Sequence, residues 1–116
     1  MIVLAALFGL VGPSGASAGR FDTTVTISVE GRDFSGLVKS PRPRKCAAGR
    51  KVLLMKQVGA EQSPSSDPVV ASDTASRNGD VYEWSTGNTG NTGRFYARVR
   101  RTAECKGDTS RTLRTQ

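Results

Sequence analysis

From Thr23 the chain alternates β-branched and polar side chains with a period of two. Val25, Ile27 and Val29 fall on one side of the stretch TTVTISVE, and Thr or Ser fills the positions between them. Because successive side chains of a strand point to opposite faces of its sheet, this alternation predicts a half-buried strand. No segment after residue 18 shows helical periodicity over three turns. The sequence therefore predicts an all-β fold.

Short segments of the same kind recur along the chain, separated by residues that favour turns. Gly31 and the pair Asn78-Gly79 predict tight turns, because these residue types tolerate positive φ. Residues 86–93, TGNTGNTG, predict a flexible loop, and segment 50–58 is apolar enough to be expected at the centre of a sheet. The expected strands are 23–30, 34–40, 50–58, 69–76, 81–85, 94–102 and 109–115.

Several short strands spaced by turn residues indicate a single small antiparallel β-sandwich of about seven strands. The alternation also predicts which side chains share a face of a strand. The expected sets are Phe34, Gly36 and Val38; Tyr82 and Trp84; Phe95, Ala97 and Val99; and, opposite the last set, Tyr96, Arg98 and Arg100.

The first eighteen residues differ from the rest of the chain. The apolar run from Ile2 to Val11 is followed by Gly12-Pro13 and then by small residues up to Ala18. This pattern predicts an export signal (residues 1–18) that is cleaved after Ala18, which leaves residues 19–116 as one secreted domain. At ~1.5 Å per residue the run is too short to cross a hydrocarbon layer of ~30 Å, so no transmembrane segment is expected. The alternative is a buried N-terminal strand or helix.

Two cysteines, Cys46 and Cys105, remain after this cleavage. In an oxidising compartment their pairing is the simplest arrangement, and the loop it closes, about 60 residues, allows roughly 4 kcal/mol of stabilisation. Two thiols without any histidine make a poor zinc site, and their wide spacing does not form a redox pair. The sequence therefore predicts a disulfide between the segment before strand 50–58 and the segment after strand 94–102.

Positive charge gathers around both cysteines, in a chain with a net charge of +7. In the first cluster, SPRPRKCAAGRK (residues 40–51), Pro41 and Pro43 lack backbone donors, so this stretch is expected to be an extended loop. A disulfide would bring the two clusters side by side, and Tyr96 would add an aromatic ring among the guanidinium groups. The candidate polyanion-binding residues are Arg42, Arg44, Lys45, Arg98, Arg100 and Arg101.

Enzymatic function is not expected. The chain has no histidine, which removes the commonest general base and the most frequent metal ligand. Asp73, Asp80 and Glu83 are candidate acid–base residues, but two of them lie where a hairpin carries solvated charge. Lys39 and Ser40 are adjacent in a strand and so point to opposite faces. No catalytic residue, metal site or cofactor is predicted.

The order of these motifs resembles a family of small exported bacterial domains, the transthyretin-like or carboxypeptidase-regulatory-like (Ig-like) β-sandwiches. The resemblance spans roughly Phe34 to Arg114. It implies a sandwich fold, an extracellular location and an accessory or adhesive role, without catalytic residues to transfer. The matching positions are Cys46, Arg50, Val52, Leu54, Gly79, Trp84, Gly93, Phe95, Tyr96, Ala97, Val99, Cys105 and Ser110.

The function expected from these observations is that of a secreted, monomeric interaction or structural module. Its basic face would bind an anionic cell-envelope polymer or another envelope protein; nucleic acid is disfavoured, because export removes the usual target. One alternative is a secreted cationic effector that acts on anionic membranes or nucleic acid. Another is that the charge serves only solubility and protects the sheet edges from aggregation.

Overall fold

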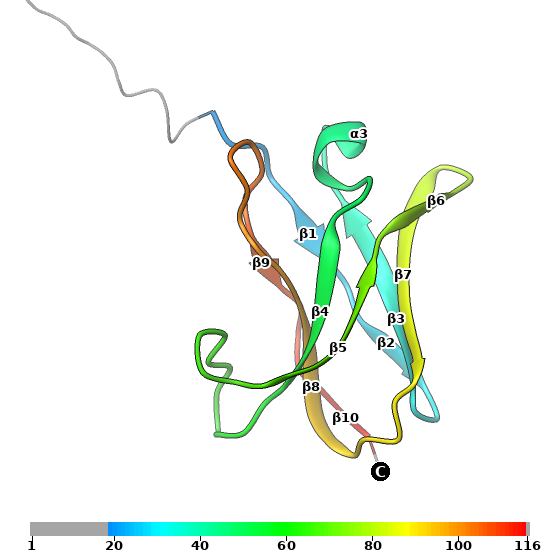
Figure 1. The fold of residues 1–116 in the computed structure, drawn as a ribbon, viewed down its shortest axis with the longest axis vertical. Helices are drawn as coiled ribbons and strands as arrows, with labels where there is room; N and C mark the ends of the chain where they lie inside the picture. Colours follow the sequence, from blue (N-terminus) through cyan, green and yellow to red (C-terminus); the bar gives the residue numbers. More distant parts are fainter. Residues whose placement is uncertain (1–18, 116) are drawn as a thin grey trace, which may run out of the picture.

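The computed structural model describes residues 19–115, so the expected signal peptide, residues 1–18, lies outside the described residues. Two antiparallel sheets pack face to face (Figure 1). Sheet 1 has the order β1-β3-β7-β6, and β2 also pairs with β3. Its strands are β1 (Thr24–Val25), β2 (Ser28–Glu30), β3 (Asp33–Lys39), β6 (Ser76–Asn78) and β7 (Val81–Asn88).

Sheet 2 has the order β10-β8-β4-β5, and β9 also pairs with β8. The strand β4 lies between β5 and β8, which confirms the prediction of a central position. The all-β sandwich is likewise confirmed. The strands of sheet 2 are β4 (Lys51–Lys56), β5 (Val69–Thr74), β8 (Gly93–Val99), β9 (Asp108–Thr109) and β10 (Leu113–Thr115).

The main core lies between the sheets and consists of the side chains that the alternation assigns to the inner faces. Phe34 of β3 and Phe95 of β8 are fully buried and meet across the core, with 5.0 Å between ring centroids. Trp84 of β7 packs into the same cluster. A large part of this packing was predictable, because a period of two fixes the inner face of each strand.

The expected strand 23–30 is divided at Thr26 and Ile27. The carbonyl of Thr26 accepts a hydrogen bond from Trp84 Nε1 (3.0 Å), so the Leu37 amide donates to Thr26 Oγ1 instead (2.9 Å). Gly36 allows this arrangement: a Cβ there would overlap the Thr26 carbonyl oxygen and lie 2.6 Å from Trp84 Nε1. The buried indole thus explains the interruption of the ladder between β1 and β2.

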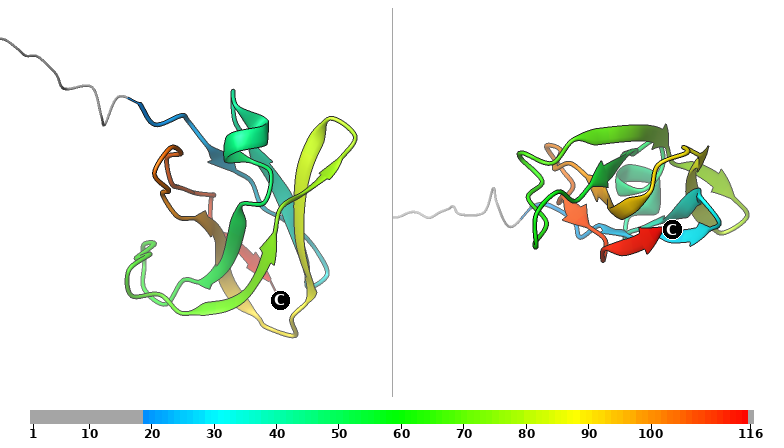
Figure 2. Two further views of the ribbon diagram at one scale, coloured as in Figure 1. Left: turned by 45° about the horizontal axis from the view of Figure 1, so that its top comes forward. Right: turned by 90° about the horizontal axis from the view of Figure 1, so that it is seen from below.

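The chain passes from sheet 2 to sheet 1 without a loop, because β5 continues into β6 through the buried residue Ala75 (Figures 1 and 2). The hairpin that follows confirms the predicted turn but shifts it by one residue. Asn78 pairs with Val81, so Gly79 and Asp80 form the turn, and Gly79 supplies the positive φ of 62°.

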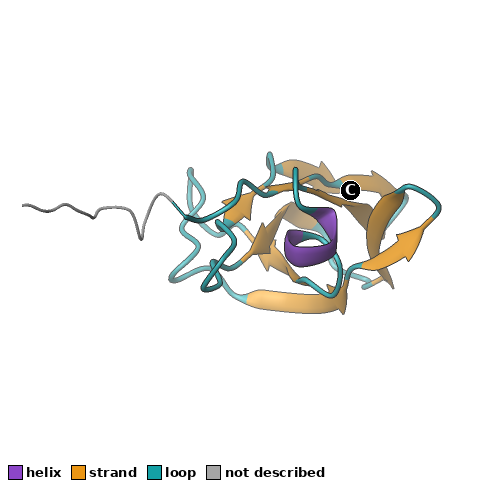
Figure 3. Cartoon of the chain, turned by 90° about the horizontal axis from the view of Figure 1, so that it is seen from above, coloured by secondary structure: helices purple, strands orange, loops and turns teal. Residues whose placement is uncertain are grey.

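A one-turn helix, α3 (Pro43–Cys46), replaces the extended loop expected within residues 40–51, and that prediction was wrong. Pro43 occupies the start of the helix, where its missing N–H costs nothing and its fixed φ suits the helical turn. Seen from above, α3 lies between the two layers of strands and covers the end of the sandwich that is at the top of Figure 1 (Figure 3).

The connection of residues 57–68, the covering loop, folds back over the outer face of sheet 2 (Figure 1). Beneath it Leu53, Met55 and Tyr96 form a second, smaller buried cluster. This cluster explains why β4 is apolar on both faces. Among the described residues, no helix has the length and apolar character needed to span a membrane.

Candidate functional site

The predicted disulfide is present and lies at the end of the sandwich covered by α3. Cys46 ends α3, Cys105 lies in the loop after β8, and their Cα atoms are 5.5 Å apart. Both cysteines are buried. Backbone hydrogen bonds join the same loop to Phe21, whose amide donates to Glu104 O (2.8 Å). The two cationic segments are therefore neighbours in space, as the sequence predicted.

Arg50 lies beneath this surface and is only 6% exposed. Its Nη1 donates to Cys46 O (2.9 Å) and to Thr23 Oγ1 (3.1 Å). Its Nη2 donates to Arg100 O (2.7 Å) and Lys106 O (3.2 Å). Burial lowers the pKa of the Arg50 guanidinium from its ordinary value. One buried cation thus fixes the backbone on both sides of the disulfide.

Four of the six candidate residues are exposed and form no ion pair with any residue in the range 19–115: Arg42, Arg44, Arg100 and Arg101. Arg42 does contact a ring, with its guanidinium carbon 5.1 Å from the centroid of Phe21. These four side chains are therefore positive charges without an acidic partner among the described residues.

Two further cations nearby are paired with acids. Lys45 Nζ lies 3.0 Å from Glu104 Oε2, and Lys106 Nζ lies 2.9 Å from Asp22 Oδ1. The two pairs are exposed and reduce the local positive charge. Of the candidate residues, Lys45 is therefore partly neutralised.

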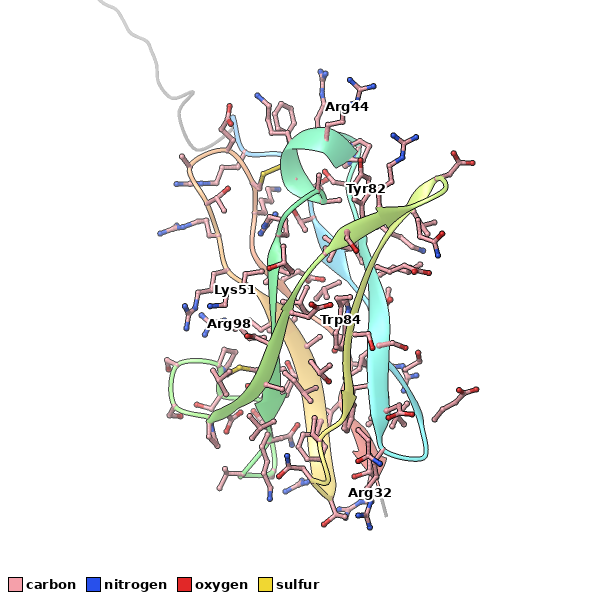
Figure 4. All side chains as sticks on the ribbon, turned by 45° about the vertical axis from the view of Figure 1, so that its right-hand side comes forward. Arg32, Arg44, Lys51, Tyr82, Trp84 and Arg98 are labelled. Atoms are coloured by element: carbon pink, nitrogen blue, oxygen red, sulfur yellow. A yellow bond between two sulfur atoms is a disulfide. The ribbon has the colours of Figure 1, made fainter. Side chains whose placement is uncertain are left out.

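Arg98 is half-buried and extends over the outer face of sheet 2, with Nη1 donating to Pro64 O of the covering loop (2.8 Å). Figure 4 shows Lys51 and Arg98 close together on this face and Arg44 farther off, at α3. The candidate residues therefore occupy two areas, one on α3 and one beside β8. We call the whole set of Arg42, Arg44, Lys45, Arg98, Arg100 and Arg101 the basic end.

Tyr96 does not join this surface, so the prediction of an exposed aromatic ring among the guanidinium groups was wrong. Its side chain is fully buried under the covering loop, and its hydroxyl donates to Asp67 Oδ2 (2.6 Å). Burial and the neighbouring Asp67 raise the pKa of Tyr96 above its usual range. Hydrogen bonds from Tyr96 and from the Ser63 amide lower the pKa of Asp67.

Three acids, of which Asp73 and Glu83 are candidate acid–base residues, accept hydrogen bonds within the fold. Asp73 accepts from the Ser85 amide (2.7 Å) and so joins the edge of β5 to β7. Glu83 accepts from Asn78 Nδ2 across the hairpin (2.9 Å), and Asp108 from the Val25 amide (2.8 Å). Within residues 19–115, His, Cys, Asp and Glu side chains form no group suited to hold a metal ion.

Comparison with known proteins finds no family model that matches this chain and no curated protein that matches it. The resemblance to exported transthyretin-like domains therefore stays a prediction, whereas the sandwich and its disulfide are structural facts.

Proposed function

We propose that this chain is an exported, non-enzymatic interaction module that binds anionic cell-envelope polymers through its basic end. The observation that carries the proposal is the Cys46–Cys105 disulfide, which holds two cationic segments together although they are far apart in the sequence. Arginine suits this task, since its planar guanidinium can donate two parallel hydrogen bonds to a carboxylate, phosphate or sulfate.

Fixed backbone geometry further supports a binding role. Arg50 ties Arg100 O and Lys106 O to the backbone of α3, so the chain that carries the exposed arginines is ordered before any ligand arrives. Less conformational freedom is then lost on binding. A surface that only aids solubility does not require such support.

The outer face of sheet 1 provides an internal contrast. The hollow on that face, about 540 Å³, is lined by Ser, Thr, Gly, apolar residues and one acid, Glu83, without any Lys or Arg. This hollow therefore offers no positive charge to a polyanion, unlike the surface around Arg100 and Arg101.

Calorimetric titration of the disulfide-bonded protein with alginate, a linear polyuronate, tests the proposal. We expect binding at about 50 mM NaCl that weakens steeply with added salt, because each neutralised charge releases counterions. Uncharged dextran serves as the control polymer and is expected not to bind. An absence of alginate binding at low salt refutes the proposed function.

A matched pair of double variants separates a specific surface from net charge alone. Arg44→Gln with Arg100→Gln removes two charges from the basic end, and Arg77→Gln with Arg114→Gln removes two exposed charges elsewhere. Only the first pair should weaken alginate binding strongly. Release of dye from anionic vesicles would instead support the alternative of a membrane-active effector.

Export is part of this proposal and has its own test. The intact mass of the protein recovered from the medium or envelope should correspond to residues 19–116 with one disulfide. Recovery only from the cell interior with residues 1–18 attached would contradict export.

A further inference from the structure

Two hollows lie next to each other at the basic end, and Arg100 and Arg101 line both of them. The first, about 180 Å³, is completed by Gly49, Arg50, Lys51, Leu53 and Thr102. The second, about 440 Å³, is completed by Pro64, Arg98, Val99, Gly107, Asp108 and Thr109. Each hollow is formed by segments that are distant in the sequence, and each contains at least three cationic side chains.

The wall between the hollows has a fixed backbone. Arg50 Nη2 holds Arg100 O at 2.7 Å, and the Thr102 amide donates to Cys105 O (2.9 Å). Gly107 packs so closely that a Cβ there would lie 2.9 Å from Arg101 N and 3.0 Å from Val99 O. The two shared arginines are therefore carried by a segment that cannot move without disturbing the disulfide loop.

We infer that the two hollows are successive subsites for neighbouring acidic sugar units of a linear anionic polysaccharide, an inference that rests on the function proposed above. In the first subsite Lys51, Arg100 and Arg101 surround the buried side chain of Leu53. Cationic groups around an apolar floor match a uronate, which has a carboxylate on a ring with an apolar C–H face.

The second subsite is the weaker of the two. Arg98 already donates to Pro64 O, and the Asp108 carboxylate lies in the lining. Asp108 accepts a hydrogen bond from the Val25 amide (2.8 Å), and its carboxylate places a negative group near the anion that the second subsite would bind. The first subsite should therefore dominate the affinity, and the second should add to it.

The chemistry of the linings favours a polysaccharide over nucleic acid. Single-stranded nucleic acid is bound by aromatic rings on which bases stack, and no aromatic side chain lines either hollow. Tyr96, the nearest along β8, is fully buried, and Phe21 is covered by Arg42.

The α3 hollow has a different origin. It is lined by five consecutive residues, Pro41 to Lys45, which all come from α3 and the two residues before it. It therefore adds charge for a long polymer but no separate subsite for a short one. A change in α3 should therefore affect binding of a long polymer more than binding of a short oligomer.

Uronate oligomers of one to four units, titrated into the disulfide-bonded protein, test the inference. Affinity should rise about tenfold from one unit to two and change little from two to four, because two subsites are filled. Equal molar affinity for one and two units, or an even rise up to four units, would overturn the two-subsite arrangement.

Single variants locate the subsites. Lys51→Gln and Arg101→Gln should each weaken binding of the two-unit oligomer about tenfold, the loss expected for one charge-assisted contact. Arg44→Gln, the same change of charge on α3, should alter it less than about twofold. Arg101→Lys keeps the charge and should restore part of the affinity.

The possible failures are distinguishable. If alginate binds but Arg44→Gln weakens the two-unit oligomer as much as Arg101→Gln does, the subsites are refuted and the proposed function stands. If alginate does not bind at all, the proposed function and the two subsites are both refuted. Unchanged thermal unfolding of each variant shows that the loss comes from the altered side chain, since all three residues are exposed.

Discussion

Arg50 donates hydrogen bonds to backbone carbonyls as far as 56 residues away in the sequence. A guanidinium carries five N–H donors in one plane, so a single side chain can serve several carbonyl groups at once. Here it serves Cys46 O, Arg100 O and Lys106 O. The backbone that carries the exposed arginines of the basic end is therefore held in place by the buried Arg50. Replacing Arg50 should mainly lower the stability of the fold.

Arg50→Met should lower the free energy of unfolding by roughly 3 kcal/mol, because it leaves buried carbonyl groups without a donor. Urea denaturation of the disulfide-bonded protein measures the change. Arg101→Met is the matched control at an exposed position and should change the free energy of unfolding by less than about 0.5 kcal/mol. Equal effects of the two substitutions would contradict the supporting role of Arg50.

Gly36 is the second residue on which the local geometry depends. Gly36→Ala places a methyl group against Thr26 O and Trp84 Nε1, so the indole must move out of the core. We expect a loss of about 3 kcal/mol in the free energy of unfolding. Gly59→Ala, where a Cβ would have no neighbour within 4 Å, is the control and should be close to neutral. Native-like Trp84 fluorescence and stability in Gly36→Ala would refute this account.

Arg50 and Gly36 differ in how far the sequence predicts their roles. Counting by twos from Val52 and Leu54 places Arg50 on the inner face of the strand, so its burial was predictable, although it is equally a member of a cationic stretch. The close approach at Gly36 was not predictable, because it depends on the indole of Trp84 in β7 and on the carbonyl of Thr26, which lies between β1 and β2.

Among the elements, the covering loop is held to sheet 2 by a hydrogen bond between two ionisable groups. Asp67 Oδ2 accepts from Tyr96 Oη and from the Ser63 amide, which lies in the same loop. Tyr96 is fully buried in the cluster with Leu53 and Met55, and Asp67 is buried as well. The attachment of the loop should therefore depend on pH at both extremes.

The free energy of unfolding should be highest between about pH 4 and about pH 10, the ordinary pKa values of Asp and Tyr. The lowered pKa of Asp67 stabilises the fold above pH 4, and this contribution is lost as pH falls through the folded-state value. The raised pKa of Tyr96 contributes below pH 10 and is lost as pH rises further.

Tyr96→Phe tests this pH dependence, since it removes the phenol and the largest cause of the Asp67 shift. Urea denaturation from acid to alkaline pH should show a flatter alkaline limb and a smaller acid limb than in the unsubstituted protein. Identical profiles would mean that the Asp67–Tyr96 pair does not fasten the loop.

The elements also show why some boundaries were predictable and others were not. Alternation predicts the inner-facing residues of β3, β7 and β8 correctly, because the apolar positions of the pattern mark the face that is buried. It does not reveal α3, where Pro43 suits both an extended path and the first residue of a helical turn. Nor does it reveal the covering loop, because a polar, proline-containing stretch gives no sign of what it covers.

In the whole molecule, the disulfide joins α3, which connects sheet 1 to sheet 2, to the loop between β8 and β9 of sheet 2. Cys46→Ala with Cys105→Ala should lower the free energy of unfolding by roughly 4 kcal/mol, the chain-entropy value for a loop of about 60 residues. Thermal and urea unfolding measure it. A change below about 1 kcal/mol would show that packing and Arg50 alone hold this end together.

The central claim is that the two cationic segments joined by this disulfide form one binding surface. The most direct test follows backbone amide shifts by NMR while alginate is added to the disulfide-bonded protein at low salt. The account predicts that the largest shifts occur at Lys51, Arg100 and Arg101, followed by Arg42 and Arg44. Shifts concentrated on the outer face of sheet 1, around Ser28, Ser35 and Glu83, or no shifts at all, would contradict it.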